Sequence, residues 1–206
     1  AIAEMKLQHA VITSVDRDDL PDYGAFIFAE TIRQIRSRLP TCSVEVLVPD
    51  FQGDGSAIRT VLDARPDIYN HNTETVPRLY KRCRPGGRYE RVMGIFALAK
   101  RLAPDIPTKT GMILGLGETT EEVLAVMRDL RAVDVDILTL GQYLRPSPAH
   151  HPLARYYSPD EFRAHIAAVS DYLGDSLLLR RSVFLADANA LVAPHKQLLA
   201  LLKVLK

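Results

Sequence analysis

Short apolar runs alternate with longer amphipathic stretches along most of the chain. The apolar runs predict strands over residues 9–15, 44–48, 67–69, 107–118 with its exit, and 135–144. The stretches between them carry apolar residues near helical spacing and predict helices over about 21–39, 56–65 and 88–103, with another after Thr119. A helix over about 159–173 and a sixth strand near 177–179 continue the series.

This regular order of strand and helix predicts an α/β fold. Strands separated by helices form a parallel sheet with right-handed crossovers. Polar residues gather after each predicted strand. Because ligands of such folds bind at the carboxyl ends of the strands, we expect an open or partial barrel with its site at that rim.

Composition and charge exclude several classes of function. The chain has 206 residues, enough for one sizeable domain, and its formal net charge is +1. A charge so near zero gives no bulk electrostatic reason to bind nucleic acid or an anionic membrane. No apolar run approaches the length of a bilayer span. We therefore expect neither nucleic acid nor membrane among the partners.

The first residues and the cysteines add two expectations. Residues 1–6 are typical of the last turns of a helix, so the chain is expected to begin within an element and not with a signal peptide. Cys42 and Cys83 form no disulfide framework and no metal-ligand spacing. Two isolated cysteines favour a reducing compartment.

The densest polar cluster spans residues 70–78, between a predicted strand and a predicted helix. One interpretation is a helix cap, with Thr75 as the N-cap residue and Pro77 in the first turn. Four further polar residues remain unexplained by a cap: Asn70, His71, Asn72 and Glu74. A ligand site at the strand's carboxyl end accounts for all of them and is favoured.

Other strand ends carry weaker candidates. The acidic residues 16–19 suit either a solvated turn or a ligand site. Gly115 and Gly117 permit a tight turn, with Thr119 capping the next helix, but their spacing is neither a dinucleotide fingerprint nor a phosphate loop. A basic run suits either a solvated face or contact with an anionic partner. It contains Arg78, Lys81, Arg82 and Arg84.

Several of these runs, taken together and in order, resemble the lipoyl synthase family of radical S-adenosylmethionine (SAM) enzymes. They are residues 11–22, 45–51, 70–80, 84–86, 115–118 and 141–147. The resemblance implies a partial (β/α)6, TIM-like radical-SAM barrel over residues 1–187, with its first β-strand missing. Residues 188–206 diverge from the family and are expected to form a separate C-terminal tail.

The resemblance also implies a reaction. The family cleaves SAM reductively to a 5′-deoxyadenosyl radical and inserts two sulfurs at C6 and C8 of a protein-bound octanoyl-lysine, in lipoate biosynthesis. It uses two [4Fe–4S] clusters. The implied partners are an octanoylated lipoyl carrier domain or the glycine cleavage H protein, and an electron donor such as ferredoxin or flavodoxin. Bacterial members are cytoplasmic, and eukaryotic members are mitochondrial or plastidic.

Site residues are implied by the same resemblance. Those expected to bind SAM are Thr13, Ser14 and Asp16 at its methionine group, Asn72 and Glu74 at the ribose or the substrate, and Gly111, Ile113, Gly115 and Glu118 beside the adenine. Those expected at the substrate are Arg78, Gln142 and Tyr143. Ser182 is a candidate ligand of the auxiliary cluster.

The family's cysteine ligands are absent from this sequence. Cys42 and Cys83 match no ligand position, and both cluster-binding loops would lie before Ala1. The chain as written is therefore expected to be inactive. It is either a truncated form of an active enzyme or a non-catalytic paralogue that binds SAM or the lipoyl carrier domain.

A Schiff-base lyase using Lys109 and Glu118 is a further alternative. Lys109 begins its predicted strand, at the rim opposite the expected site, which argues against this activity.

Overall fold

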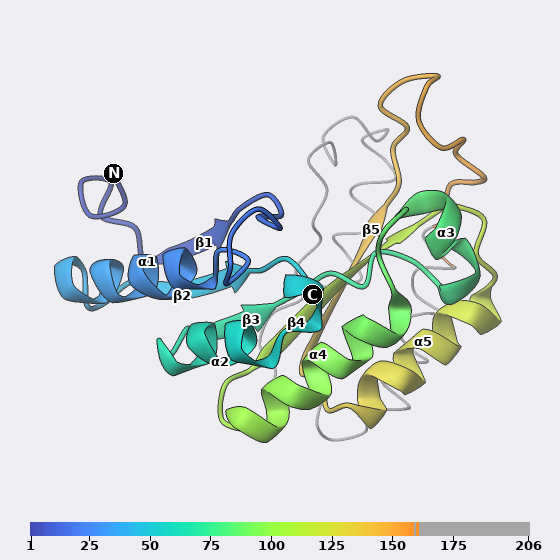
Figure 1. The fold of residues 1–206 in the computed structure, drawn as a ribbon. Helices are drawn as coiled ribbons and strands as arrows, with labels where there is room; N and C mark the ends of the chain where they lie inside the picture. The colour runs from blue at the N-terminus through green and yellow to red at the C-terminus, as the bar shows by residue number, and fades with distance from the viewer. Residues whose placement is uncertain (159, 161–206) are drawn as a thin grey trace.

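The computed structural model of this protein describes residues 1–158 and 160. Its sheet has five parallel strands that follow one another in chain order (Figure 1). The strands are β1 (His9–Thr13), β2 (Ser43–Leu47), β3 (Ile68–Asn70), β4 (Thr108–Leu114) and β5 (Ile137–Gln142). The α-helices are α1 (Ala25–Arg38), α2 (Gly55–Asp63), α3 (Tyr80–Cys83), α4 (Tyr89–Leu102) and α5 (Thr120–Ala132), with short 3₁₀ turns η1 (Phe51–Gly53) and η2 (Pro77–Leu79).

Alternation along the strands separates a helix-covered face from an inner face. In β2, Val44 and Val46 are fully buried in a core shared with α1 and α2. Met112 and Leu114 of β4 belong to a second core cluster shared with α4 and α5. Figure 1 shows these helices along one face of a curved sheet. The predicted α/β fold with a partial barrel is therefore confirmed.

Two element boundaries differ from the prediction. Helix α1 begins at Ala25 instead of near Pro21, because Tyr23 and Gly24 adopt left-handed backbone conformations. The Asp22 carboxylate accepts hydrogen bonds from the N–H groups of Gly24 and Phe26, so it still satisfies the start of the helix. Residues 1–6 form a single turn and not the end of a longer helix.

The amino ends of the strands are tied by two aspartates that act alike. Asp67 precedes β3, and its Oδ2 accepts hydrogen bonds from the Val44 N–H of β2 (2.6 Å) and from an arginine at the end of α1 (2.8 Å). Asp136 precedes β5, and its Oδ2 accepts from the Thr108 N–H of β4 (2.7 Å) and from Lys100 near the end of α4 (2.5 Å). We call Asp67 and Asp136 the amino-end clamps. Each joins two neighbouring strands and a helix.

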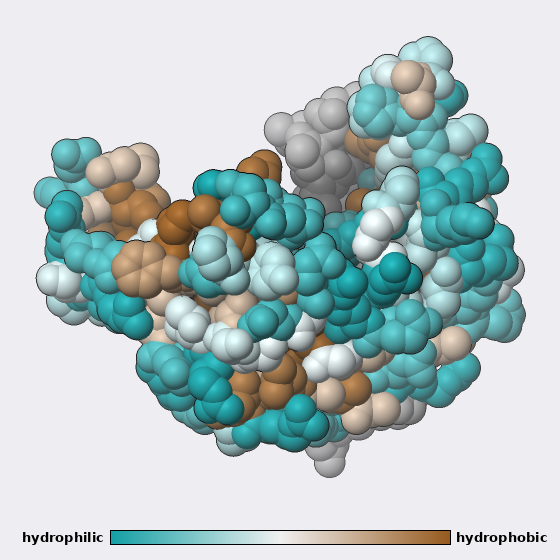
Figure 2. All heavy atoms as spheres, in the orientation of Figure 1, coloured by the Kyte–Doolittle hydropathy of each residue, from teal (hydrophilic) through white to brown (hydrophobic). Residues whose placement is uncertain are grey.

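The β1 side of the molecule exposes apolar side chains. Met5, Val11, Val15, Phe26 and Ile27 are all more than half exposed. Figure 2 shows brown, hydrophobic surface in this part of the molecule. β1 pairs with β2 alone and is an edge strand of the described sheet. Within residues 1–158 and 160, no helix has both the length and the hydropathy to cross a membrane.

Several predicted features lie outside the described residues. They are most of the helix at 159–173, the strand near 177–179, the cluster ligand Ser182 and the tail at 188–206. The predicted boundary between residues 187 and 188 also falls there.

Candidate functional site

β3 ends at Asn70 because the chain then bulges away from β4 and returns to it at Glu74. The Glu74 N–H donates to the Gly111 carbonyl (2.9 Å), and the Glu74 carbonyl accepts from the Ile113 N–H (2.7 Å). Residues 71–73 therefore form a protrusion between two anchored points. We call residues 70–76 the rim turn, since it lies at the carboxyl end of β3.

Glu74 occupies a strained position in this turn. Its φ is +67°, a left-handed conformation that is uncommon for residues with a side chain. The Thr75 N–H donates to the Thr73 carbonyl (2.8 Å), which closes a three-residue turn around Glu74. The Tyr80 hydroxyl donates to the same carbonyl and fixes the turn from outside. Strain of this kind persists only where surrounding contacts impose it, and it concentrates at functional sites.

Asn72 lies directly over β4 at Gly111. A Cβ atom on Gly111 would lie 2.9 Å from Asn72 Oδ1 and 3.1 Å from Thr139 Oγ1, closer than real Cβ contacts allow. Glycine is therefore required for the Asn72 side chain to pass over the strand. The structure brings together four of the predicted SAM-binding residues here: Asn72, Glu74, Gly111 and Ile113.

Two buried polar atoms of the rim turn have no hydrogen-bond partner among the described residues. They are Nε2 of His71 and Oγ1 of Thr75. Thr75 caps no helix, because the N-cap position of η2 is Val76, so the capping interpretation is wrong. Burial lowers the pKa of His71 to about 4, and its Nδ1 bonds the Val48 carbonyl (2.8 Å). The imidazole is therefore neutral, and its other nitrogen is an unused acceptor.

The turn after β4 is organised by Glu118, which is buried. Its carboxylate accepts hydrogen bonds from the N–H groups of Gly115 (2.6 Å) and Leu116 (2.9 Å) and from the Tyr157 hydroxyl (2.7 Å). Gly115 has φ +99°, and a Cβ on it would lie 2.4 Å from the amide nitrogen of Gln142. Glu118 thus shapes the backbone of the turn, and Gly115 makes room for the protein's own side chain.

Gln142 and Tyr143, predicted to contact substrate, both bind the loop that follows β5. The Gln142 amide nitrogen donates to the carbonyls of Leu114 (3.2 Å) and Arg155 (3.3 Å), while its oxygen accepts from the Tyr157 N–H (2.9 Å). The Tyr143 hydroxyl donates to a backbone carbonyl of the same loop (2.9 Å). In this structure both side chains hold residues 151–157 over the Gly115 turn.

Arg78, also predicted at the substrate, contacts the same turn from the other side. Its Nε and Nη2 donate to the Glu122 carboxylate (2.7 and 2.9 Å), and Nη2 also donates to the Gly117 carbonyl (2.9 Å). Hydrogen bonds from Arg78 and from the Thr119 N–H lower the pKa of Glu122 to about 2. Thr119 and Glu122 form a capping box at the start of α5, which confirms the predicted cap.

The basic run divides into two pairs of cations. Arg84 donates from Nη1 to the Asn72 carbonyl (2.8 Å) and so supports the rim turn, as Arg78 supports the turn after β4. Lys81 and Arg82, on α3, are exposed. Only the second pair is exposed on α3 without these supporting contacts, which the sequence pattern did not distinguish.

The end of β1 carries Thr13, Ser14 and Asp16, all exposed. The next loop along the sheet is unusual because Phe51, Gln52 and Gly53 all have positive φ. Sequence reasoning missed this left-handed turn, since two of its three residues are not glycine. A hydrogen bond from the Gln52 amide to Asp18 (2.9 Å) connects the two loops.

Sequence comparison decides the family. The sequence model of the radical SAM superfamily matches residues 1–130. The chain belongs to the radical SAM superfamily.

Relatives within the radical SAM superfamily narrow the resemblance. The chain is 59% identical over 162 residues to a lipoyl synthase of Rubrobacter xylanophilus, covering 79% of this chain and 50% of the relative. It is 57% identical over 168 residues to a lipoyl synthase of Thermus thermophilus, covering 81% of this chain and 52% of the relative. The chain thus spans about half the length of the curated relatives it matches.

Solved structures of the superfamily share the fold. Methylornithine synthase matches with a TM-score of 0.57 at 15% identity, over 75% of this chain and 46% of that protein. The SAM methyltransferase TsrM of Kitasatospora setae matches with a TM-score of 0.53 at 19% identity, over 74% and 31% of the two chains. At these identities the likeness establishes the architecture alone.

Radical SAM enzymes need thiolate ligands for an iron–sulfur cluster, and the described residues do not supply them. Cys42 is fully buried in the core, and Cys83 lies at the end of α3 with a pKa raised by burial. No three His, Cys, Asp or Glu side chains within residues 1–158 and 160 are grouped so that they could hold a metal ion. These residues therefore do not fit a cluster, and no reaction step is assigned to one.

Lys109 lies near the start of β4, as predicted, and is paired. Its Nζ donates to both carboxylate oxygens of Glu45 (2.9 and 3.0 Å). Glu118, its supposed partner in a Schiff-base lyase, binds backbone N–H groups instead. The geometry disfavours that alternative.

Proposed function

We propose that this chain forms the SAM-binding part of a lipoyl synthase. The observation that carries the proposal is the rim turn, in which Asn72 lies over Gly111 and a strained Glu74 is anchored to β4 on both sides. It occurs in a chain 57–59% identical to lipoyl synthases over the matched region. The exposed amide, carboxylate and hydroxyl groups of this rim are suited to a ligand that carries both hydroxyl and ammonium groups.

The residues present fit SAM in three places. Asn72 and Glu74 would hold the ribose hydroxyls, because they lie on the inner side at the carboxyl end of β3. Ile113 and the backbone at Gly111 would flank the adenine ring. Thr13, Ser14 and Asp16 would contact the methionine group from the end of β1.

Two unpartnered buried atoms support this assignment. His71 Nε2 and Thr75 Oγ1 reduce the stability of an empty rim turn, since buried polar atoms without a partner are costly. Groups of this kind are tolerated where function requires them. Glu118, Arg78 and Gln142 would act indirectly, by fixing the backbone around the ligand.

Bound SAM would supply the radical that removes hydrogen from the octanoyl chain when it is reductively cleaved. The residues of this chain would bind and orient SAM and keep its nucleoside fixed against β4. The octanoyl-lysine substrate, its lipoyl carrier domain or H protein, and a ferredoxin- or flavodoxin-type electron donor belong to the proposal for the whole enzyme. Arg78, Gln142 and Tyr143 remain proposed contacts to that substrate.

Titration calorimetry with SAM tests the binding proposal. We expect wild-type chain to bind SAM and Asn72→Ala to bind about tenfold more weakly, since one or two ligand hydrogen bonds are lost. Asp63→Ala, at an exposed position on α2, is the matched control and should bind as wild type does. Equal affinity in the wild-type chain and Asn72→Ala would contradict the proposal.

A second candidate function is binding of the carrier domain without catalysis. It rests on the exposed cations Lys81 and Arg82 of α3, which would face an acidic partner. The double charge reversal Lys81→Glu with Arg82→Glu should weaken salt-sensitive binding of an octanoylated carrier domain and leave SAM binding unchanged. Arg59→Glu on α2 is the control for net charge. Unchanged carrier binding in the double variant would exclude this face.

A further inference from the structure

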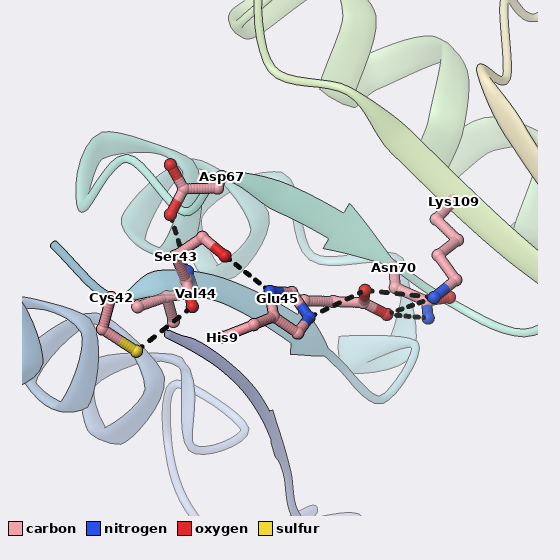
Figure 3. Close-up of polar contacts among 8 residues, drawn as sticks. All are labelled: His9, Cys42, Ser43, Val44, Glu45, Asp67, Asn70 and Lys109. Carbon is pink, nitrogen blue, oxygen red and sulfur yellow. Dashed lines mark hydrogen bonds and ion pairs between the residues drawn. The ribbon is translucent and has the colours of Figure 1, made fainter. Parts of the chain in front are cut away.

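A buried polar cluster lies on the inner face of the sheet, below the rim turn (Figure 3). At its centre is Glu45 of β2, which is only 2% exposed. Its carboxylate accepts two hydrogen bonds from Lys109 Nζ (2.9 and 3.0 Å) and one from Asn70 Nδ2 (2.8 Å). His9 Nε2 of β1 lies 3.9 Å from the same carboxylate. Side chains from four neighbouring strands therefore meet at Glu45.

Asn70 is the member of this cluster that begins the rim turn. It is the last residue of β3, a strand of three residues that pairs with β4 only at Tyr69 and Asn70. Beyond it the chain leaves the sheet and is not anchored to β4 again as a strand until Glu74. The Asn70–Glu45 hydrogen bond therefore fixes the backbone at the point where the protrusion starts.

The energetics of Asn70 favour a role other than stability. Its Oδ1 is buried and has no hydrogen-bond partner among the described residues. A buried amide that is satisfied on one side only is less favourable than an apolar side chain of similar size. Lys109 neutralises Glu45 and so keeps a charged acceptor available to Asn70 in the interior.

We propose that Asn70 is a positioning residue, which through Glu45 and Lys109 holds the rim turn so that Asn72 lies over Gly111 and Glu74 at the rim. In this arrangement the turn is preformed to receive the nucleoside before the ligand arrives. The identity of that ligand rests on the proposed function. The positioning itself is a property of the free protein.

Hydrogen exchange of the ligand-free chain tests the positioning directly. The reporter amides are those of His71, Thr73 and Glu74, which donate to the Lys109 carbonyl (3.1 Å), Thr110 Oγ1 (2.9 Å) and the Gly111 carbonyl (2.9 Å). In Asn70→Leu we expect these amides to exchange about tenfold faster or more, while the unfolding temperature is unchanged or higher. Unchanged exchange, or faster exchange throughout the chain together with a lower unfolding temperature, would overturn the proposal.

Two double variants of the ion pair give an independent route. Glu45→Met with Lys109→Met removes the acceptor of Asn70 without leaving an unpaired charge, and it should accelerate the same three amides. Glu45→Gln with Lys109→Met keeps an amide oxygen for Asn70 and is the matched control, expected to exchange as the wild-type chain does. Equal exchange in the two double variants would show that the hydrogen bond to Asn70 does not position the turn.

A double-mutant cycle connects the positioning to the ligand. Asn70→Leu should weaken SAM binding about tenfold in the wild-type background and less than about twofold in the Asn72→Ala background, because its effect passes through Asn72. Additive effects would contradict that route. If the wild-type chain bound no SAM, the proposed function would fail, while the exchange experiment would still decide whether Asn70 positions the turn.

Discussion

The two ends of the sheet satisfy their polar groups in opposite ways. At the amino end, the amino-end clamps Asp67 and Asp136 each join a strand, its neighbour and a helix. At the carboxyl end, the rim turn contains a left-handed glutamate and two buried polar atoms without partners among the described residues. Parallel α/β folds place stability at the first end and ligands at the second, and this chain follows that division.

The carboxyl end is nevertheless not loosely built. Arg78, Arg84 and Glu118 each hold a backbone segment of the rim by hydrogen bonds. The unsatisfied groups are therefore confined to the rim turn itself. A rigid frame around a strained turn is the arrangement expected of a preorganised binding site.

The largest expected difference between the two ends depends on pH and arises from His71. Its pKa falls from 6.5 to about 4 in the folded chain because it is buried, so the unfolded chain binds a proton that the folded chain does not between these values. Stability present above pH 6.5 is lost as the pH falls toward 4, by about 3 kcal/mol. Urea unfolding from pH 7.5 to 4.5 measures this loss.

His71→Leu should flatten that pH dependence, whereas His150→Leu, at an exposed position of the loop after β5, should leave it unchanged. Equal slopes in the wild-type chain and His71→Leu would show that the buried imidazole does not determine it.

An intermediate effect is expected at the amino end. Asp136→Ala leaves Lys100 and the Thr108 N–H without their shared partner and should lower the free energy of unfolding by about 2–3 kcal/mol. SAM affinity should change less than about twofold, since the clamp lies at the opposite end from the site. Thermal unfolding and calorimetry measure the two quantities. A loss of affinity as large as that of Asn72→Ala would break the separation of the two ends.

The smallest effect compares two buried threonines at the carboxyl end. Thr75→Val removes a hydroxyl that has no partner among the described residues, so stability should stay the same or rise by about 1 kcal/mol. Thr110→Val removes a hydroxyl that accepts from the Thr73 N–H and donates to the His71 carbonyl, and it should cost about 1–3 kcal/mol. Denaturant unfolding distinguishes the two variants. A similar loss in both would mean that Thr75 is satisfied after all.

Local sequence patterns were sufficient for most of the fold. Alternation predicted β2, where Val44 and Val46 face the helices, and the capping pattern of Thr119 predicted the start of α5. The beginning of α1 was misplaced because Tyr23 adopts a left-handed conformation that no residue preference signals. Thr75 was open to a capping interpretation because a threonine before Pro77 is compatible with a cap in sequence, although Val76 takes that position.

The site could be predicted only in part. The polar density of residues 70–75 pointed to the rim turn, and the structure places Asn72 and Glu74 beside Gly111 and Ile113. The cluster at Glu45 joins residues far apart in the sequence, so no local pattern could reveal it. The contacts of Arg78 and Arg84 likewise depend on the tertiary fold, which is why a single basic run divided into structural and exposed cations.

The most direct test of this division is a hydrogen-exchange footprint of SAM on the wild-type chain. The account predicts slower exchange on adding SAM in residues 71–75 and 111–117, at the carboxyl end, with no change around Asp67 and Asp136. Protection around the amino-end clamps, or no protection of the rim turn at saturating SAM, would contradict it.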